Sequence, residues 1–485
     1  MVQAISYCLL FLLCMLVLAR VRARSMRQAV LLIASYVLYV TWGWWFAVVL
    51  LTSTIANFLI GQWLQRKTSG AILSFGIFLN LLLLGSFKYL PEAAVQIPLS
   101  SLQTFAHLAM PLGLSFWTFQ ALSYLFDIYR DEELDPTFFE FALYMVFFPV
   151  TISGPICRMP DMLPQFRFEE PTPRSSIGHG FQRIAIGVFM VEVAKLLGQG
   201  ILGGDGIVAG FDRVTQWSGA DVWCLSLGYG LQLFLDFAGY SHIAIGAAQA
   251  IGFTVPENFS RPFESTNASV FWTRWHMSLS FWIRDYVFLP LAMLRREVWW
   301  RNLALVIAMI LFGLWHRASI LFLLWGCYHG VLLILHRQVQ QVERKFDWEP
   351  SSKLWTPISW IATMALINLG WIFFRANSLP QARQMWLAVL SPASYSSHFL
   401  NGSLYVLVGA LAAGYAIVVF VSDTLDSYSN AAETSEPAAG RGFIGFMARS
   451  RWFWIPPLYA LALIFLLIVT LTRGASTAQF MYNKF

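Results

Sequence analysis

The chain has 485 residues, of which 58% are hydrophobic and only 12% are charged. Its mean hydropathy of +0.60 lies far outside the range of a soluble domain, so we expect a polytopic membrane protein. The net charge of +6 comes from basic residues scattered along the chain, and no basic tract could follow a phosphate backbone. Composition therefore excludes a soluble enzyme and argues against a nucleic-acid partner.

Apolar stretches recur from one end of the chain to the other. They lie near residues 2–18, 28–42, 44–63, 70–87, 103–126, 138–156, 181–202, 221–251, 303–315, 318–335, 355–374, 402–421 and 452–471. Several are too short or too polar for a plain span, so the pattern predicts about ten to twelve crossings together with re-entrant or interfacial helices. We therefore expect an all-α fold in which residues 1–485 form one integral-membrane domain in a lipid bilayer.

Basic residues follow two of the early stretches. Arg20, Arg22, Arg24 and Arg27 follow the first stretch, and Arg66 and Lys67 follow the third. Because basic connections stay in the cytoplasm, we expect both of these on the cytoplasmic side and the N-terminus outside. The first stretch lacks a basic leader and a small-residue cleavage site, which indicates a retained helix rather than a signal peptide.

Two segments are polar enough to be aqueous. Residues 158–176 contain four prolines among charged residues, which predicts a structured connection. Residues 422–442 are rich in Ser, Ala, Glu and Gly, which predicts a mobile loop before the last helix. Residues 256–301 are too polar for a simple span and too aromatic for an ordinary loop, which predicts amphipathic segments at the interface.

Helical spacing over residues 271–286 separates two kinds of side chain. Trp272, His276, Ser280 and Arg284 recur on one face, beside an apolar stripe of Trp275, Leu279 and Trp282. One interpretation is an interfacial helix anchored by its tryptophans and arginines. In the other, the polar face closes a cavity where His276 meets His316, Arg274 and Arg284 supply positive potential, and Asp285 balances one arginine.

His316 lies between an apolar run at residues 303–315 and a second at 318–335. The first run spans about 20 Å as a helix, against about 30 Å of hydrocarbon, so this short helix would place His316 below the membrane surface. An ionisable residue there is costly and should line a wet or protein-enclosed cavity. His316 is thus either a structural histidine or a base that takes a proton from a hydroxyl, with Arg317 helping to keep it neutral. His242 is a third buried candidate.

Common catalytic signatures are missing from the sequence. It contains no Gly-rich nucleotide loop, no His-Glu-x-x-His and no Gly-x-Ser-x-Gly motif, and its five cysteines lack metal-ligand spacing. We therefore expect no metal and no tightly bound cofactor. Residues 110–117 and 154–158 instead resemble helix interruptions at membrane depth, which are tolerated beside a cavity.

An ordered set of motifs resembles the membrane-bound O-acyltransferase family. The motifs are Pro111–Gln120, Phe148–Ile156, Asp236–Ser241, Pro256–Phe259, Trp272–Tyr286 and Gly313–His316. The resemblance is strongest over residues 110–375, and as an ordered set it is highly specific. Residues 370–376 and 480–482 resemble the alginate O-acetylase branch, whereas residues 278–288 also resemble the teichoic-acid D-alanylation branch.

This resemblance implies a fold and a site. The fold is a ring of transmembrane helices around a thinned centre, with a tunnel from a cytoplasmic donor entrance to a funnel on the other side. His316 would be the catalytic histidine and His276 the second histidine of the site. The resemblance implies that Trp315, Arg274, Trp275, Ser278 and Asp285 build the surroundings of the site. With Trp282, Arg284 and Arg317, taken from the residue pattern, they are the expected tunnel and substrate-binding residues. The chain departs from the family at His242, where Asp is common, and at Arg317, where Gly is frequent.

The implied activity is acyl transfer across the inner membrane of a bacterium. The acyl group would be acetyl from acetyl-CoA. The acceptor would be a hydroxyl of alginate, cellulose, peptidoglycan or another exopolysaccharide, among which the sequence does not decide, or the serine of a relay protein. The aqueous loops are too small for an esterase-like domain, so we expect a separate periplasmic esterase-like transferase as partner. Two alternatives stay open: transfer of D-alanyl or another acyl group from a carrier protein to a cell-wall polymer, and, in another class, a transporter or flippase.

Overall fold

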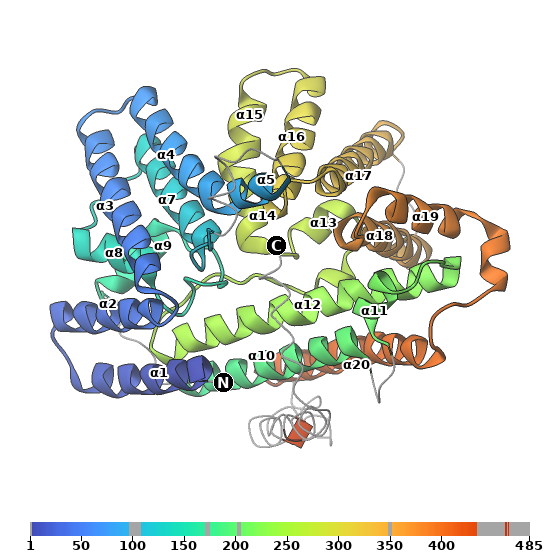
Figure 1. Cartoon of the computed structure of the whole chain (residues 1–485), viewed down its shortest axis with the longest axis horizontal. Coiled ribbons are helices and arrows are strands. Elements are labelled where there is room, and N and C mark those ends of the chain that lie inside the picture. Colours follow the sequence, from blue (N-terminus) through green and yellow to red (C-terminus); the bar gives the residue numbers. More distant parts are fainter. Residues whose placement is uncertain are drawn as a thin grey trace. The chain divides into compact units, whose positions relative to one another are not determined.

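The computed structural model describes residues 2–96, 108–169, 175–200, 205–347 and 352–433, together with residues 461, 462 and 464. Over this part of the chain the fold is helical, and the sole β-type pairing is an isolated bridge between Phe259 and Trp275. Seven of the described helices are long and apolar enough to cross a membrane. The predicted all-α, multi-pass membrane fold is therefore confirmed (Figure 1).

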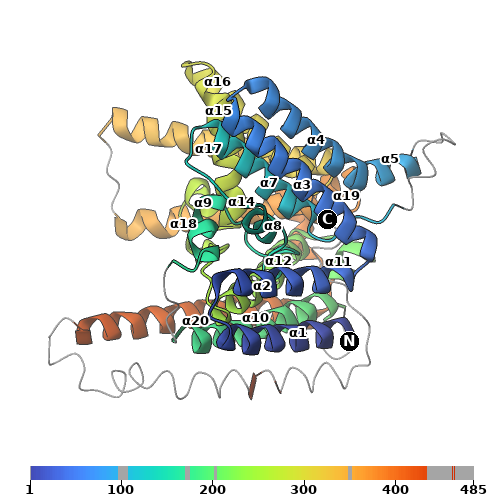
Figure 2. The same cartoon turned by 90° about the vertical axis from the view of Figure 1, so that its left-hand side faces the viewer.

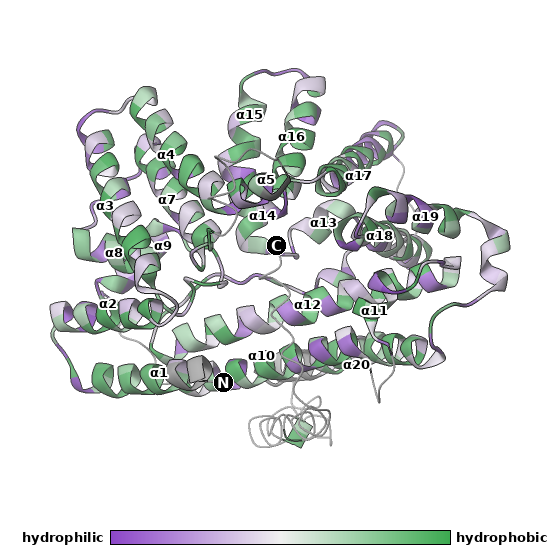
Figure 3. Cartoon of the chain, viewed as in Figure 1, coloured by the Kyte–Doolittle hydropathy of each residue, from purple (hydrophilic) through white to green (hydrophobic). Residues whose placement is uncertain are grey.

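The seven candidate spans lie in α3, α4, α12, α16, α17, α18 and α20, at residues 44–66, 70–88, 219–250, 298–316, 320–345, 353–375 and 402–424. In Figure 3 the ribbons of α3, α4 and α16 are largely green, whereas the α3–α4 and α15–α16 connections are purple. Polar residues thus gather where helices end, as expected for segments that leave a bilayer.

The chain forms two compact units, each built from separated stretches. Unit 1 contains the chain up to Ile184, Ser241–Pro262 and Trp272–Ala308. Unit 2 contains Ala185–Tyr240, Phe263–Phe271 and the chain from Met309 onward. The helices α10, α12 and α16 each begin in one unit and end in the other.

The helices fall into two groups according to the unit in which each begins. Those that begin in unit 1 are α1 (Val2–Arg20), α2 (Arg24–Val40), α3 (Trp44–Arg66), α4 (Gly70–Lys88), α5 (Leu90–Gln96), α7 (Leu114–Tyr129), α8 (Phe138–Val146), α9 (Met159–Phe166), α10 (Ser175–Gln199), α14 (Met277–Ile283), the π-helix η2 (Arg284–Phe288), α15 (Leu289–Met293) and α16 (Val298–His316). Those that begin in unit 2 are α11 (Ile207–Asp212), α12 (Gly219–Ala250), α13 (Ala268–Trp272), α17 (Ile320–Lys345), α18 (Ser352–Arg375), α19 (Leu379–Leu390), α20 (Gly402–Glu433) and the short 3₁₀ turn η3 (Pro392–Ser396). The 3₁₀ turn η1 (Pro262–Glu264) begins at the last residue of a unit 1 stretch.

In unit 1, α7 packs against both α3 and α4, which also contact each other (Figures 1 and 2). Small residues allow this close approach: a Cβ on Gly61 would lie 2.5 Å from the ring of Tyr124, and one on Gly76 would lie 2.6 Å from Leu125. Between α3 and α4, the side-chain amides of Asn57 and Asn80 donate to each other at 3.2 and 2.7 Å. The two glycine contacts hold the C-terminal half of α7, which reaches the candidate site through Asp127, whereas the asparagine pair joins α3 to α4.

A buried carboxylate joins α2, α8 and α9. Glu140 is fully buried, and its oxygens accept from the guanidinium groups of Arg24 and Arg167 and, at 2.9 Å, from the backbone N–H of Thr137, where they complete a capping box. Burial alone would raise the pKa of Glu140, but these hydrogen bonds lower it by more, so the pKa lies below its ordinary value.

We predict that Glu140→Gln lowers stability by about 1–3 kcal/mol, because charge-assisted hydrogen bonds are lost and both arginines can still reach water. The folded pKa is depressed, so this stabilisation is present above the unfolded pKa and is lost as pH falls through the folded value. Thermal unfolding in detergent at pH 7.5 measures the effect. The exposed Glu133→Gln is the matched control, and equal melting temperatures for the two variants would contradict the prediction.

In unit 2, backbone contacts bring α17 against the end of α16. A Cβ on Gly313 would lie 2.2 Å from the carbonyl oxygen of Phe322, and one on Gly326 would lie 2.4 Å from that of Met309. α18 packs on the same helix α17. The last turn of α16, which carries His316, is therefore held between two neighbouring helices.

Three sequence predictions need correction or completion. α16 begins at Val298 and has 19 residues, about 28 Å, so the short-helix argument for the depth of His316 is wrong. The helix continues through Trp299 and Trp300 because helix formation does not stop where hydropathy falls. α20 runs to Glu433, so residues 422–433 are helical rather than a loop, and 434–442 lie outside the described residues. Of the connection at 158–176, residues 158–169 contain α9, as expected for a structured segment, and 170–174 lie outside the described residues.

Candidate active site

The chain is not helical where the sequence pattern predicted a continuous helix. α13 ends at Trp272, and α14 begins at Met277. Between them the backbone pairs with residues 258–260: Ser260 N–H donates to the carbonyl of Arg274 at 3.0 Å, and Met277 N–H donates to that of Asn258 at 2.8 Å. The predicted face of Trp272, His276, Ser280 and Arg284 is therefore wrong, because hydrogen bonds to a distant segment replace the helical ones.

His276 lies at this break with φ 42° and ψ 54°, in the left-handed region. A non-glycine residue rarely adopts this conformation, and where it occurs the surrounding structure holds it. The imidazole is 2% exposed, and its Nδ1 lies 3.3 Å from Oδ1 of Asn258. Burial lowers the pKa of His276 to about 3, so the ring is neutral at physiological pH.

Ser278 and Asn258 connect His276 to the neighbouring loop. The Ser278 hydroxyl donates to Asn258 Oδ1 at 2.6 Å and accepts from the N–H of Ile156 at 3.0 Å. The second contact lies in the predicted helix interruption at residues 154–158, which thus belongs to the surroundings of the site. Asn258 also donates through Nδ2 to Ser241 at 3.0 Å.

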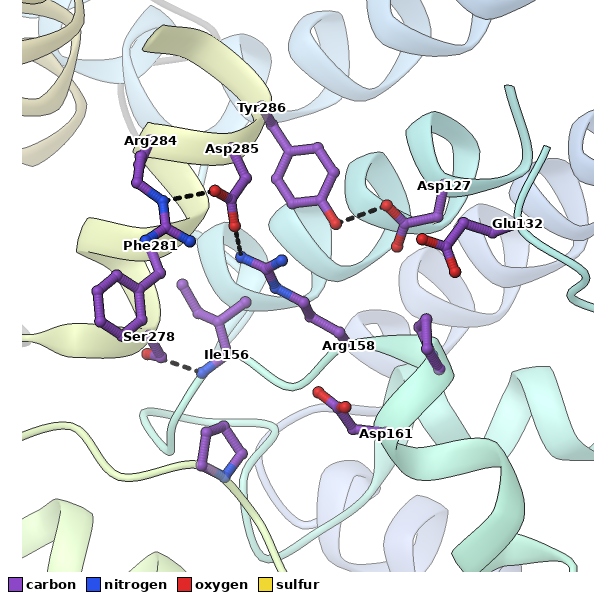
Figure 4. Close-up of a pocket in the computed structure, with 12 residues that line it drawn as sticks. Asp127, Glu132, Ile156, Arg158, Asp161, Ser278, Phe281, Arg284, Asp285 and Tyr286 are labelled. Carbon is purple, nitrogen blue, oxygen red and sulfur yellow. Dashed lines mark hydrogen bonds and ion pairs between the residues drawn. The ribbon is translucent and has the colours of Figure 1, made fainter. Parts of the chain in front are cut away.

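A cavity of about 390 Å³ opens next to these residues in unit 1 (Figure 4). Its acidic and basic lining residues are Asp127, Glu132, Asp161, Asp285, Arg158 and Arg284. The Asp285 carboxylate bridges two of them, since it accepts from Arg158 at 2.6 Å and from Nε of Arg284 at 2.6 Å. Burial raises the pKa of Asp285, but both arginines lower it by more, so its pKa lies below the usual range.

Aromatic side chains form one wall of the cavity and the layer beneath it. The hydroxyl of Tyr286 donates to Asp127 Oδ1 at 2.7 Å, and the guanidinium of Arg158 lies over the Tyr286 ring at 5.1 Å. Behind this wall, Trp282 is buried, donates to the carbonyl of Phe119 at 3.0 Å and packs on the Tyr286 ring at 5.2 Å. Trp282 therefore supports the wall and is absent from the lining.

His316 is the last residue of α16 and is 7% exposed. Aromatic rings from α16, α17 and α18 surround its imidazole. The ring centroids lie at 4.6 Å for Trp315, 5.0 Å for Phe374, 5.5 Å for Phe312, and 6.0 Å for Phe322 and Trp325. The next residue, Arg317, is exposed. His316 thus stands where a buried aromatic cage gives way to an exposed basic side chain.

His242 has a different environment from the other two histidines. Its Nδ1 accepts from Nε of Arg183 at 3.3 Å, and Arg183 forms a two-point ion pair with Glu257 at 2.5 and 2.7 Å. This network links α10, α12 and the segment that precedes Asn258. The geometry indicates a structural connection.

The structure separates the predicted residues into groups. Ser278, Arg284 and Asp285 line the cavity, and Asp285 balances Arg284 as predicted. Arg274 and Trp275 lie on the extended segment, and Trp315 and Arg317 flank His316. Sequence reasoning missed Asn258, Arg158, Asp127 and Tyr286 as site residues. Asn258, Arg158 and Tyr286 stand inside segments noted in the sequence, but spacing does not reveal their contacts. Arg158 and Tyr286 bond to residues more than a hundred positions away, and Asn258 bonds to His276 across the break between α13 and α14.

The model of the membrane-bound O-acyltransferase family matches residues 98–376, which is more than half of the chain. The chain belongs to this family. As a membrane-bound O-acyltransferase it is an acyl-transferring enzyme, so the transporter alternative is set aside. The match covers the cavity residues and both His276 and His316.

Curated relatives agree with this assignment. The chain is 32% identical to a probable alginate O-acetylase, AlgI, of Pseudomonas aeruginosa, over 85% of this chain and 79% of the relative. It is 31% identical to a peptidoglycan O-acetyltransferase of Helicobacter pylori over 73% of this chain and 71% of the relative. A teichoic acid D-alanyltransferase of Bacillus subtilis is 29% identical over 54% of this chain and 68% of the relative.

Proposed function

We propose that this O-acyltransferase takes acetyl from acetyl-CoA in the cytoplasm and passes it to a hydroxyl of a polysaccharide outside the inner membrane. The transfer is direct or runs through the serine of a periplasmic esterase-like partner. The similarity to O-acetylases covers 85% and 73% of the chain, against 54% for the D-alanyltransferase, which favours acetyl over D-alanyl.

The observation that carries the proposal is the placement of His316. It is a buried imidazole at a helix end, inside a family whose chemistry needs a proton acceptor for a hydroxyl nucleophile. In the proposed step the hydroxyl oxygen attacks the thioester carbon while His316 takes the hydroxyl proton. The carbon–sulfur bond then breaks, and the proton passes to the leaving thiolate, which gives an ester and free CoA.

The cavity of unit 1 supports a cytoplasmic donor. It adjoins the end of α7, where Tyr129 lies beside Gly70, the first residue of α4. The α3–α4 connection precedes Gly70, and it begins with Lys67 after Arg66, the last residue of α3. The positive-inside rule puts that connection in the cytoplasm, where acetyl-CoA is made. Ser278, Arg284 and Asp285 would then contact the donor near its entrance, and His276 would orient or stabilise the thioester.

The charges of the cavity indicate which part of the donor it suits. Four carboxylates and two guanidinium groups line it, and Asp285 already pairs with both guanidinium groups. Such a lining repels the phosphates of CoA, so the neutral amide arm fits the cavity and the phosphates stay outside. Among the described residues, Oδ2 of buried Asp127 accepts no hydrogen bond and could accept one from an amide N–H of that arm.

The donor choice predicts a clear result with purified protein. Incubated with acetyl-labelled CoA and an oligosaccharide acceptor, the enzyme should release one free CoA for each ester formed. A D-alanyl thioester on a carrier protein should give little or no transfer. The reverse preference would replace acetylation with D-alanylation, and transfer by neither donor in cells or with purified protein would overturn the proposed activity.

A further inference from the structure

We propose that Asn258 is a positioning residue that fixes His276 in the tautomer with the proton on Nδ1, so that Nε2 presents its lone pair to the reaction. The inference rests on the proposed function for the role of His276 in acyl transfer. The assignment of the tautomer itself rests on the hydrogen bonds around Asn258 alone.

The orientation of the Asn258 amide follows from its neighbours. The backbone N–H of Ser278 faces this amide at 3.4 Å, and a backbone N–H can only donate. It is in the first turn of α14, where no carbonyl of the same helix is available to it. The atom of Asn258 that faces Ser278 is therefore the oxygen, and the amide nitrogen points to Ser241 at 3.0 Å.

The same oxygen faces His276. Oδ1 of Asn258 lies 3.3 Å from Nδ1 of His276 and 2.6 Å from the Ser278 hydroxyl, which donates to it. Because a carbonyl oxygen only accepts, Nδ1 must carry the proton of this hydrogen bond. A neutral imidazole has one protonated nitrogen, so Nε2 is the acceptor atom.

The backbone supports this arrangement on both sides. Met277 N–H donates to the Asn258 carbonyl at 2.8 Å, and the Phe259 ring packs on Trp275 at 5.2 Å, next to their backbone bridge. The left-handed φ of 42° at His276 turns the chain between these contacts. Asn258 is fully buried, so water cannot replace its carbonyl as the partner of Nδ1.

The His276 imidazole is neutral although charged residues lie on the segments next to it. The charged side chains on the adjoining segments are Glu257, Arg261, Arg274, Arg158 and Asp285. Burial is the cause that lowers the pKa of His276. A neutral ring with a fixed tautomer can accept a proton or a hydrogen bond through Nε2 at any pH where the protein works.

Two substitutions at Asn258 distinguish the effect of its side-chain carbonyl oxygen from the effect of its side-chain volume. Asn258→Leu keeps the volume and removes the acceptor, and we expect kcat to fall about 100-fold with KM changed little, as when an orienting partner of a histidine is lost. Asn258→Asp keeps an oxygen beside Nδ1 and should retain about a tenth or more of the activity at pH 8. Its added charge raises the pKa of His276, so its activity should fall at a higher pH on the acid side than wild type.

Asn80→Leu is the matched control, because Asn80 is another buried asparagine of unit 1, its amide hydrogen-bonds between α3 and α4, and it does not line the cavity. It should lower the melting temperature as much as Asn258→Leu does, yet keep kcat. Equal loss of kcat in Asn258→Leu and Asn258→Asp, or normal kcat in Asn258→Leu, would overturn the positioning role. If His276→Asn retained full activity while Asn258→Leu lost it, the role of His276 in the proposed function would fail instead.

A spectrum tests the tautomer without any reaction. Protein labelled with ¹⁵N-histidine should show, in the difference between wild type and His276→Asn, one pair of signals with a protonated Nδ1 and an unprotonated Nε2. In Asn258→Leu this pair should shift toward the other tautomer. A wild-type difference signal with the proton on Nε2 would refute the assignment, whatever the activity of the enzyme.

Discussion

Replacing His316 with alanine is expected to abolish acyl transfer and to leave the protein folded and inserted. The imidazole is the proposed base, and loss of general-base catalysis costs about 10²–10⁴-fold in rate. The cage around it consists of five aromatic rings that pack on one another, for example Phe322 on Phe374 at 4.7 Å. The fold of unit 2 therefore does not depend on the histidine ring.

The measurement is label transferred from acetyl-CoA per folded protein, with folding checked by size-exclusion chromatography and thermal unfolding. His329→Ala is the matched control, since His329 is a fully buried histidine on α17 that packs on Trp325 at 4.8 Å. We expect this control to lose stability but to keep its turnover once folded. Full activity in His316→Ala would remove the proposed base.

Replacing His276 is expected to lower turnover about 100-fold or more, because a group that orients or stabilises the reacting thioester is lost. The choice of substitute matters at this position. The backbone is left-handed, which asparagine tolerates better than alanine does. His276→Asn therefore removes the imidazole with little change to the chain, whereas His276→Ala also adds backbone strain.

We expect both His276 variants to lose activity, and only His276→Ala to lower the melting temperature by a clear margin. Steady-state kinetics and thermal unfolding on the same preparations provide the comparison. If His276→Asn turned over near the wild-type rate, His276 would be a structural residue that shapes the break between α13 and α14.

The sequence predicted the features that depend on hydropathy and ordered motifs. The apolar stretches predicted the multi-pass helical fold. Motifs such as Gly313–His316 predicted the family, because a motif can be recognised without knowing how its backbone folds locally. The ion pair between Asp285 and Arg284 was also predictable, because the two residues are neighbours in the chain.

Other features depend on contacts between distant segments. Helical periodicity could not show that the backbone near Asn258 would replace the helical hydrogen bonds of residues 273–276. It could not show that Arg158, from a separate loop, would share Asp285 with Arg284. The length of α16 was underestimated for another reason, since tryptophan and arginine at a membrane interface continue a helix beyond its apolar run.

Transport of label across a sealed vesicle tests the central claim most directly. Vesicles would hold the enzyme with the α3–α4 connection outward, with acetyl-labelled CoA outside and a hydroxyl acceptor sealed inside. We predict that label appears on the enclosed acceptor with wild-type protein and not with His316→Ala, while CoA stays outside. Label that reaches only an acceptor added on the same side as acetyl-CoA, or equal labelling by His316→Ala, would contradict an acyl transfer through the membrane at His316.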